Sequence, residues 1–108
     1  MGEPILDLSG IIDLYKEDAR RMIEKMQADI EHWEEIQQGG PARTELRRLS
    51  HQLRGSGRTY GFRHVTRFCK AIENIMLKME KGTIMPDELV QKSIRKKLEL
   101  LAAAFGAS

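Results

Sequence analysis

His51 is the side chain of this sequence best placed for nucleophilic chemistry, and it opens the stretch HQLRGSGRTYGF. On a helix with about 100° of rotation per residue, His51 lies about 160° from both Leu49 and Leu53. Because these leucines belong to an apolar stripe, we expect the imidazole to face solvent. A free imidazole is largely neutral at pH 7, so one ring nitrogen offers a lone pair to an electrophile such as a phosphoryl group.

The charge around His51 is basic. Residues 41–81 carry ten basic side chains against three acids, whereas residues 1–40 carry ten acids against four bases. Two interpretations stay open: helices of opposite sign lie side by side, or a basic face attracts an acidic partner. The helical rotation places the following basic residues within about 60° of His51: Arg47, Arg48, Arg54 and Arg58.

Gly55 is unusual, because a glycine inside a helix costs roughly 1 kcal/mol relative to alanine. It lies one turn after His51 and does not face the apolar stripe, so close helix packing does not account for it. A bare backbone at this position would let another protein approach the imidazole. Gly57 lies on the inward side, where close packing of two helices explains a glycine.

Glu73 is the candidate to orient the imidazole. In an antiparallel hairpin that turns near Gly61, residues whose numbers sum to about 124 lie level, which pairs His51 with Glu73 and Arg54 with Lys70. A carboxylate that accepts a hydrogen bond from Nδ1–H leaves Nε2 as the nucleophile, as in catalytic dyads. The alternative is a surface carboxylate that pairs only with Arg54 or Lys70.

The stretch from His51 to Phe62 resembles the signature of histidine-containing phosphotransfer (HPt) domains. In that signature a phosphorylatable histidine is followed by a basic residue, a glycine and a small residue, which match Arg54, Gly55 and Ser56. The resemblance covers roughly residues 11–105, and the Gly-Phe ending is similar to the phosphorylated N-terminal domain of chemotaxis histidine kinases. It implies a helical bundle that carries a phosphoryl group in a phosphorelay.

Several roles follow from this resemblance. It implies that His51 is the phosphoacceptor, that Glu73 orients the ring as in the chemotaxis-kinase branch, and that Arg54 stabilises phosphate charge. Arg54 stands where the family usually has lysine, and Gly57 where it more often has serine or alanine. The surface expected to bind the partner consists of Arg47, Arg48, Gly55, Ser56, Arg58 and Lys70.

The resemblance also implies the partner, which is a response-regulator receiver domain, a histidine kinase or both. Phosphoryl transfer depends on metal ions and positioning, and this sequence shows neither an aspartate cluster for Mg²⁺ nor a nucleotide-binding loop. We therefore expect a phosphohistidine carrier rather than an enzyme. It would have no cofactor of its own, and the partner would supply Mg²⁺.

The elements that must position these residues are helices. Apolar residues recur at steps of three and four, and no segment alternates with period two. The predicted helices cover residues 11–15, 19–36, 41–60, 65–79 and 87–105, with the continuity of the first two left open. We expect an all-α fold, an antiparallel up-and-down four-helix bundle with an additional short N-terminal helix.

Composition limits the remaining possibilities. With 108 residues the chain has room for one domain, placed over residues 1–108 with a core at about 9–105. No apolar run reaches the ~18 residues of a membrane span and no secretory signal is visible, so we expect a cytoplasmic monomer that does not contact membranes. Cys69 lacks a partner for an internal disulfide and is expected to be a small buried apolar group.

Three other interpretations have less support. A metal site is disfavoured because Asp29 and His32 form a single pair, whereas di-metal bundles need two such pairs. Nucleic-acid binding is disfavoured because the basic stripe has no exposed aromatic residue for stacking. A helical-bundle adaptor that is never phosphorylated is the main alternative. His32 and His64 are expected at the surface.

Overall fold

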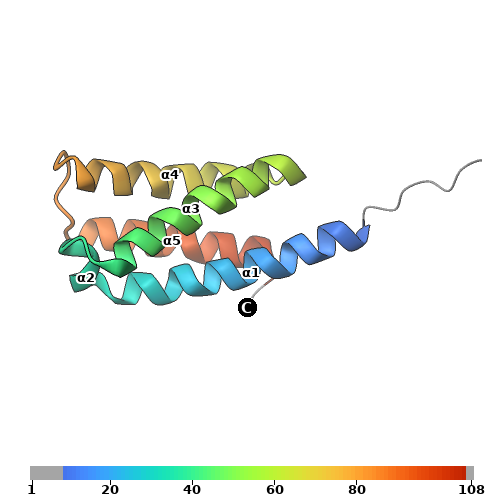
Figure 1. Cartoon of the computed structure of the whole chain (residues 1–108), viewed down its shortest axis with the longest axis horizontal. Coiled ribbons are helices and arrows are strands. Elements are labelled where there is room, and N and C mark those ends of the chain that lie inside the picture. Colours follow the sequence, from blue (N-terminus) through green and yellow to red (C-terminus); the bar gives the residue numbers. More distant parts are fainter. Residues whose placement is uncertain (1–8, 107–108) are drawn as a thin grey trace, which may run out of the picture.

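Five helices form the part of the chain that this computed structural model describes, residues 9–106. They are α1 (Ser9–Glu31), α2 (Trp33–Gln37), α3 (Pro41–Tyr60), α4 (Arg63–Glu80) and α5 (Glu88–Ala104). The four long helices run alternately up and down, and α2 lies at one end of the bundle (Figure 1). The predicted all-α antiparallel bundle is therefore confirmed. The ends of the predicted domain, residues 1–8 and 107–108, lie outside the described residues.

The core consists of the apolar stripes of the four long helices. α3 packs against α1 and α4, and α5 packs against the same two helices. Burial of each large aliphatic side chain contributes roughly 1.5–3 kcal/mol, so the inward faces of α3 and α4 are firmly held and the residues on their outer faces are held with them. Side chains with no exposure include Met26, Leu46, Leu53, Ile72, Met76 and Ile94.

The N-terminal third differs from the prediction in one respect. Residues 11–15 are not a separate short helix, because they form the first turns of a continuous α1. The additional short helix is instead α2, which begins after the chain leaves helical geometry at His32, with φ −90° and ψ 53°. Periodicity did not reveal this break, because Ile30 and Ile36 on its two sides are both buried in the same core.

Leu89, an apolar residue in the first turn of α5, does not face the core. Its side chain is 74% exposed. Leu89 precedes the buried Ile94 by five residues, or about 140° of rotation, whereas Val90 precedes it by four and packs against the core. Asp87 caps this helix, since its carboxylate accepts the Val90 N–H at 3.0 Å.

The turn between α3 and α4 sets the register of the two helices. Gly61 ends α3 with φ at 81°, a left-handed conformation that glycine adopts without strain. The Phe62 N–H then donates to the Gly57 carbonyl at 2.7 Å, which closes the helix end. Gly57 also lets the helices approach closely, because a Cβ there would lie 3.0 Å from Cγ1 of Val65. The close-packing interpretation of Gly57 is confirmed.

An aromatic cluster ties this turn to the rest of the bundle. The ring centroids of Tyr15 and Tyr60 are 4.5 Å apart, those of Tyr15 and Phe62 are 5.2 Å apart, and those of Phe62 and Phe105 are 5.5 Å apart. Such contacts are worth roughly 0.5–1.5 kcal/mol each beyond burial. The hairpin end of α3 and α4 is therefore fixed to α1 and to the end of α5.

Candidate functional site

His51 and Glu73 meet across the outer surface of α3 and α4. The His51 side chain keeps 64% of its exposure, and its Nδ1 lies 2.6 Å from Oε2 of Glu73. The second carboxylate oxygen, Oε1, lies 2.7 Å from Nη1 of Arg54. Glu73 itself is only 9% exposed at its side chain. The structure thus brings together the three residues that the sequence assigns to chemistry.

This contact determines what each ring nitrogen can do. An ionised carboxylate only accepts hydrogen bonds, so Nδ1 carries the proton and donates a hydrogen bond to Glu73. In the neutral ring Nε2 is then unprotonated, and its lone pair is available as a nucleophile. The exposure of the His51 ring leaves room for a large electrophile to reach it.

Arg54 has a supporting position in this cluster. Its Nη2 lies 3.4 Å from Nδ1 of His51, but both atoms are donors when Nδ1 holds the proton, so this approach is not a hydrogen bond. Its bond to Oε1 gives the buried carboxylate a cationic partner, and burial of a carboxylate without one is costly. Glu73 therefore does not fit the alternative of a surface carboxylate that pairs only with Arg54 or Lys70, because it is buried and bonds to His51 and to Arg54 at once. Lys70 is not part of this cluster and lines a neighbouring groove.

The other basic residues expected near His51 divide between pairs and free charges. Arg47 is bound to Glu80, with Nη1 2.8 Å from Oε1. Arg48 has no acid within ion-pair distance among the described residues, and its charge acts to lower the pKa of the Asp29 carboxyl of α1. Arg58 is exposed, and no described residue lies within ion-pair distance of it. The predicted basic stripe is therefore partly neutralised by acids of the same bundle.

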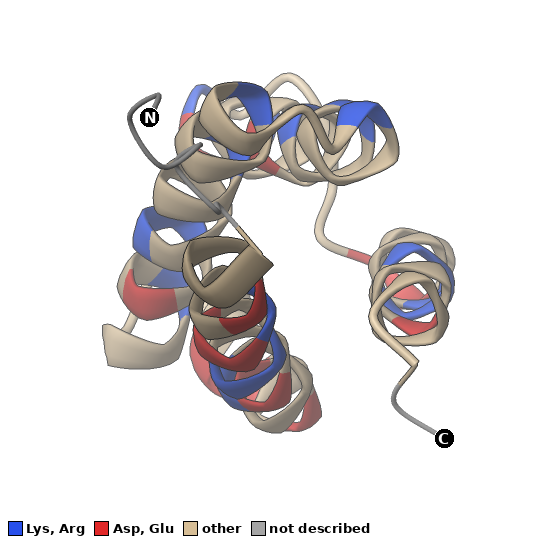
Figure 2. Ribbon diagram, turned by 90° about the vertical axis from the view of Figure 1, so that its right-hand side faces the viewer, with Lys and Arg blue, Asp and Glu red and all other residues tan. Residues whose placement is uncertain are grey.

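The distribution of charge bears on the two interpretations left open by the sequence. Red and blue segments alternate along α1, whereas the charged segments of the α3–α4 pair are mostly blue (Figure 2). Some opposite charges do pair between helices, as Arg95 of α5 does with Glu31 of α1 at 2.8 Å. Opposite charges therefore do lie side by side between α1 and α5, and the hairpin end of α3 and α4 keeps its positive charge. Attraction of an acidic partner to that end stays a prediction.

Gly55 and Ser56 lie on different sides of α3. A Cβ on Gly55 would meet nothing within 4 Å, so packing does not require a glycine there and the surface beside His51 is open. Ser56 is half-buried, its hydroxyl donates to the Leu53 carbonyl at 3.2 Å, and it lines a hollow shared with Tyr15 of α1. The structure therefore does not place Ser56 on the His51 surface.

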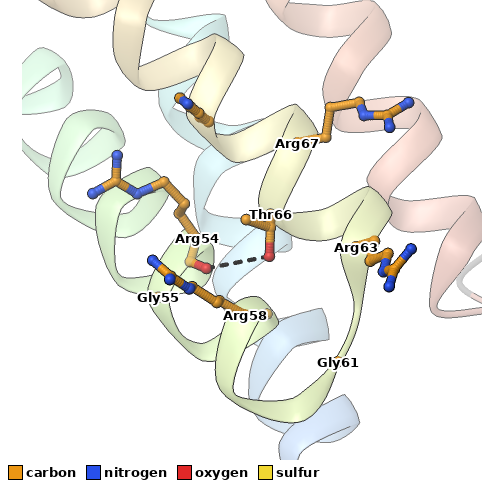
Figure 3. Close-up of a pocket in the computed structure, with 9 residues that line it drawn as sticks. Arg54, Gly55, Arg58, Gly61, Arg63, Thr66 and Arg67 are labelled. Carbon is orange, nitrogen blue, oxygen red and sulfur yellow. Dashed lines mark hydrogen bonds between the residues drawn. The ribbon is translucent and has the colours of Figure 1, made fainter.

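Two basic residues beside the site were missed by the sequence analysis. Arg63 and Arg67 of α4 line the same groove as Arg58 and Lys70, between the two helices (Figure 3). Their spacing from Lys70, at seven and three residues, puts all three on one face of α4. That spacing was the signal that could have found them.

The remaining candidates have structural environments. Burial, with a smaller effect of the Glu73 charge, raises the pKa of the Cys69 thiol to about 12, which agrees with the predicted inert apolar group. His32 and His64 are exposed, as predicted. Within residues 9–106 no three His, Cys, Asp or Glu side chains are grouped to hold a metal ion. No helix in that range has the length and apolarity needed to cross a membrane.

Asp29 has an environment that the sequence analysis did not anticipate. It is 9% exposed, and its Oδ2 has no hydrogen-bond partner among the described residues. Burial, together with the adjacent Glu45 carboxyl, raises the pKa of Asp29 to about 7, while Arg48 acts in the opposite direction. At its place between α1 and α3, Asp29 therefore holds a proton to a higher pH than an ordinary aspartate does.

The fold and the site together define a small helical module in which an exposed histidine, His51, bonds to a buried carboxylate. A family model described as Hpt domain matches residues 10–104, most of the chain, so the chain belongs to the Hpt domain family. Members of this family are phosphocarrier modules of phosphorelays. No curated protein and no solved structure matches the chain. The resemblance predicted from the His51 stretch is confirmed.

Proposed function

We propose that this chain accepts a phosphoryl group on Nε2 of His51 and exchanges it with an aspartate of a response-regulator receiver domain. The observation that carries the proposal is the 2.6 Å contact between Nδ1 and Glu73, because it leaves Nε2 free. In transfer, the Nε2 lone pair forms a bond to phosphorus of the partner's aspartyl phosphate. The P–O bond to the aspartate breaks, and the carboxylate leaves with the electron pair.

Glu73 has a second task in this proposal, which is to stabilise the product. The phosphorylated ring keeps its proton on Nδ1, so the ring carries a positive charge. A carboxylate 2.6 Å from Nδ1 favours that charged ring, in the way that the aspartate of a catalytic triad favours an imidazolium. The reverse transfer, from Nε2 to a receiver aspartate, uses the same contacts.

The chemistry of activation is assigned to the partner. A receiver domain holds Mg²⁺ in its own acidic site, which is where the family resemblance places the metal, and a histidine kinase brings its own nucleotide site. The chain acts as a monomeric cytoplasmic carrier, and its open surface at Gly55 admits the partner. Gly55, Arg54, Arg58 and Lys70, which line one groove, are the proposed partner-facing residues.

Transfer of label tests this function. The purified chain is mixed with Mg²⁺ and a panel of receiver domains carrying radioactive aspartyl phosphate, and label on the chain should be acid-labile and base-stable. His51→Gln should accept no label, whereas His64→Gln, at an exposed histidine on α4, should accept it like the wild type. Full labelling of His51→Gln would show that His51 is not the phosphoacceptor. A wild-type chain that binds a receiver without taking up label would be the unphosphorylated adaptor.

A further inference from the structure

A groove of about 750 Å³ opens between α3 and α4, beginning one turn from His51 (Figure 3). Gly55, Gly57 and Gly61 contribute bare backbone to its lining. No acidic and no aromatic side chain is among the residues that line it. Its cationic side chains are Arg54 and Arg58 from α3, and Arg63, Arg67 and Lys70 from α4.

Apart from Arg54, which bonds to Glu73, the cations of this groove lack the partners that most arginines of the bundle have. Within the described residues, six of the ten arginines bond to an acid or to a backbone carbonyl, namely Arg20, Arg21, Arg43, Arg47, Arg54 and Arg95. Of the other four, Arg48 acts through its charge on Asp29, and the remaining three all line the groove. Lys70 likewise has no acid within ion-pair distance in residues 9–106.

Unpaired like charges on one surface repel one another and attract anions. The attraction is stronger in a concave surface than on a flat one, because the low-dielectric walls concentrate the field. Nothing in the described bundle offsets the charge of Arg58, Arg63, Arg67 and Lys70. The groove is therefore a positively charged surface that attracts anions.

The shape of the groove selects the kind of anion. The side chains of Arg54 and Arg58 extend to one side and those of Arg63 and Arg67 to the other, so they do not converge on one point (Figure 3). A compact anion such as phosphate would therefore reach the arginines of one side but not those of the other. The bare backbone of Gly55 and Gly61, where a Cβ would meet nothing within 4 Å, admits the main chain of an extended ligand. The absence of aromatic lining gives no platform for stacked bases.

We infer that this groove binds an extended acidic segment of a partner protein, a stretch of Asp and Glu residues lying between α3 and α4. Carboxylates of the segment pair with Arg58 on one rim and with Arg63 and Arg67 on the other. This binding needs no phosphorylation of His51, so it is a site beyond the proposed phosphoacceptor. It would hold the partner next to the imidazole in either state of the ring.

A binding experiment with a defined probe tests the inference. The full chain is titrated into a short fluorescein-labelled peptide of alternating Asp and Gly residues, at about 25 mM salt where charges act over roughly 20 Å. The double variant Arg63→Glu/Arg67→Glu should bind at least about tenfold more weakly, since two exposed pairs become two repulsions. The matched control is Lys92→Glu/Lys96→Glu, which makes the same charge change at the same spacing on α5.

Each outcome decides the question. Loss of binding in the α4 double variant with retention in the α5 control supports the groove, and raising the salt to about 250 mM should remove most of the difference. Equal loss in both variants means that net charge alone is responsible, and absence of binding at low salt overturns the inference. Tighter binding of a single-stranded oligonucleotide of equal charge would assign the groove to nucleic acid instead. His51→Gln should bind the peptide normally, so failure here and failure of phosphotransfer are separate results.

Discussion

Replacing Glu73 with alanine should remove the tautomeric preference of His51. The hydrogen bond from Nδ1 at 2.6 Å is made to a charged acceptor, and such bonds contribute roughly 1.5–3 kcal/mol. Since about 1.4 kcal/mol is a factor of ten, the bond favours the Nδ1–H form by roughly ten- to a hundredfold. The wild-type neutral ring should therefore be almost entirely Nδ1–H, and the variant ring a mixture.

The same substitution should have a modest effect on stability. Loss of one member of a fully buried ion pair costs about 3–5 kcal/mol, because a charge is left without a partner. Here both partners reach water, His51 at 64% and Arg54 at 33% side-chain exposure, so about 1–2 kcal/mol is expected. Phosphotransfer should slow by roughly ten- to a hundredfold, the usual effect of removing a group that orients a reacting side chain.

Ring ¹⁵N chemical shifts of His51 and single-turnover transfer rates measure these effects. Glu80→Ala is the matched control, because it also removes a carboxylate from α4. Glu80 pairs with Arg47 of α3 and does not contact His51. Glu73→Gln should have a tautomer preference and a transfer rate between those of the wild type and of Glu73→Ala, since an amide oxygen still accepts a hydrogen bond from Nδ1–H but carries no charge. If Glu73→Ala keeps the Nδ1–H ring, or transfers as fast as Glu80→Ala, Glu73 does not orient the imidazole.

Three further predictions use other parts of the structure. Gly55→Ala should raise the free energy of unfolding by roughly 0.5–1 kcal/mol, because the added Cβ meets nothing within 4 Å. Gly55→Gln should slow phosphotransfer steeply without lowering the melting temperature. Normal transfer by Gly55→Gln would mean that a bare backbone at this position is not needed for the partner to approach. The pKa of Asp29 is about 7 in the fold against an ordinary 3.8, so between these values the folded chain holds a proton that the unfolded chain releases. The free energy of unfolding should therefore fall by about 2 kcal/mol from pH 5 to pH 8. Urea midpoints should show this fall in the wild type and a flatter profile in Asp29→Asn, and equal slopes would refute it. Arg54→Gln should leave the Nδ1–H form of the unmodified ring dominant and shorten the lifetime of the phosphohistidine, which acid-labile label remaining over time would measure.

The part of the site that sequence predicts well is the part that depends on regular helix geometry. His51 faces outward because it lies opposite Leu49 and Leu53, and it meets Glu73 because antiparallel helices joined at Gly61 have equal rise per residue. Both steps use rotation and rise alone. The contact at 2.6 Å follows from them without knowledge of the rest of the bundle.

The features that sequence did not predict depend on neighbouring helices. Arg47 and Arg48 share the outward face of α3, but Arg47 pairs with Glu80 of α4, and the charge of Arg48 acts on Asp29 of α1. Ser56 was included through the family motif, although helix rotation puts it about 140° from His51. The break at His32 is a local backbone change that leaves the apolar period intact, so no periodic signal marks it.

Arg54 explains how a buried carboxylate serves two states of the same ring, if His51 is the phosphoacceptor. Whenever the unmodified ring is neutral, the charge of Glu73 is balanced by the Arg54 guanidinium at 2.7 Å. Once Nε2 carries a phosphoryl group, the ring becomes cationic and itself balances Glu73, while new negative charge appears beside Arg54. A guanidinium has five donors in a planar fork, so it can turn one edge toward phosphate without leaving the carboxylate. A lysine ammonium, a single point charge, would have to share one position between the two anions, which gives a physical reason for arginine where the family usually has lysine.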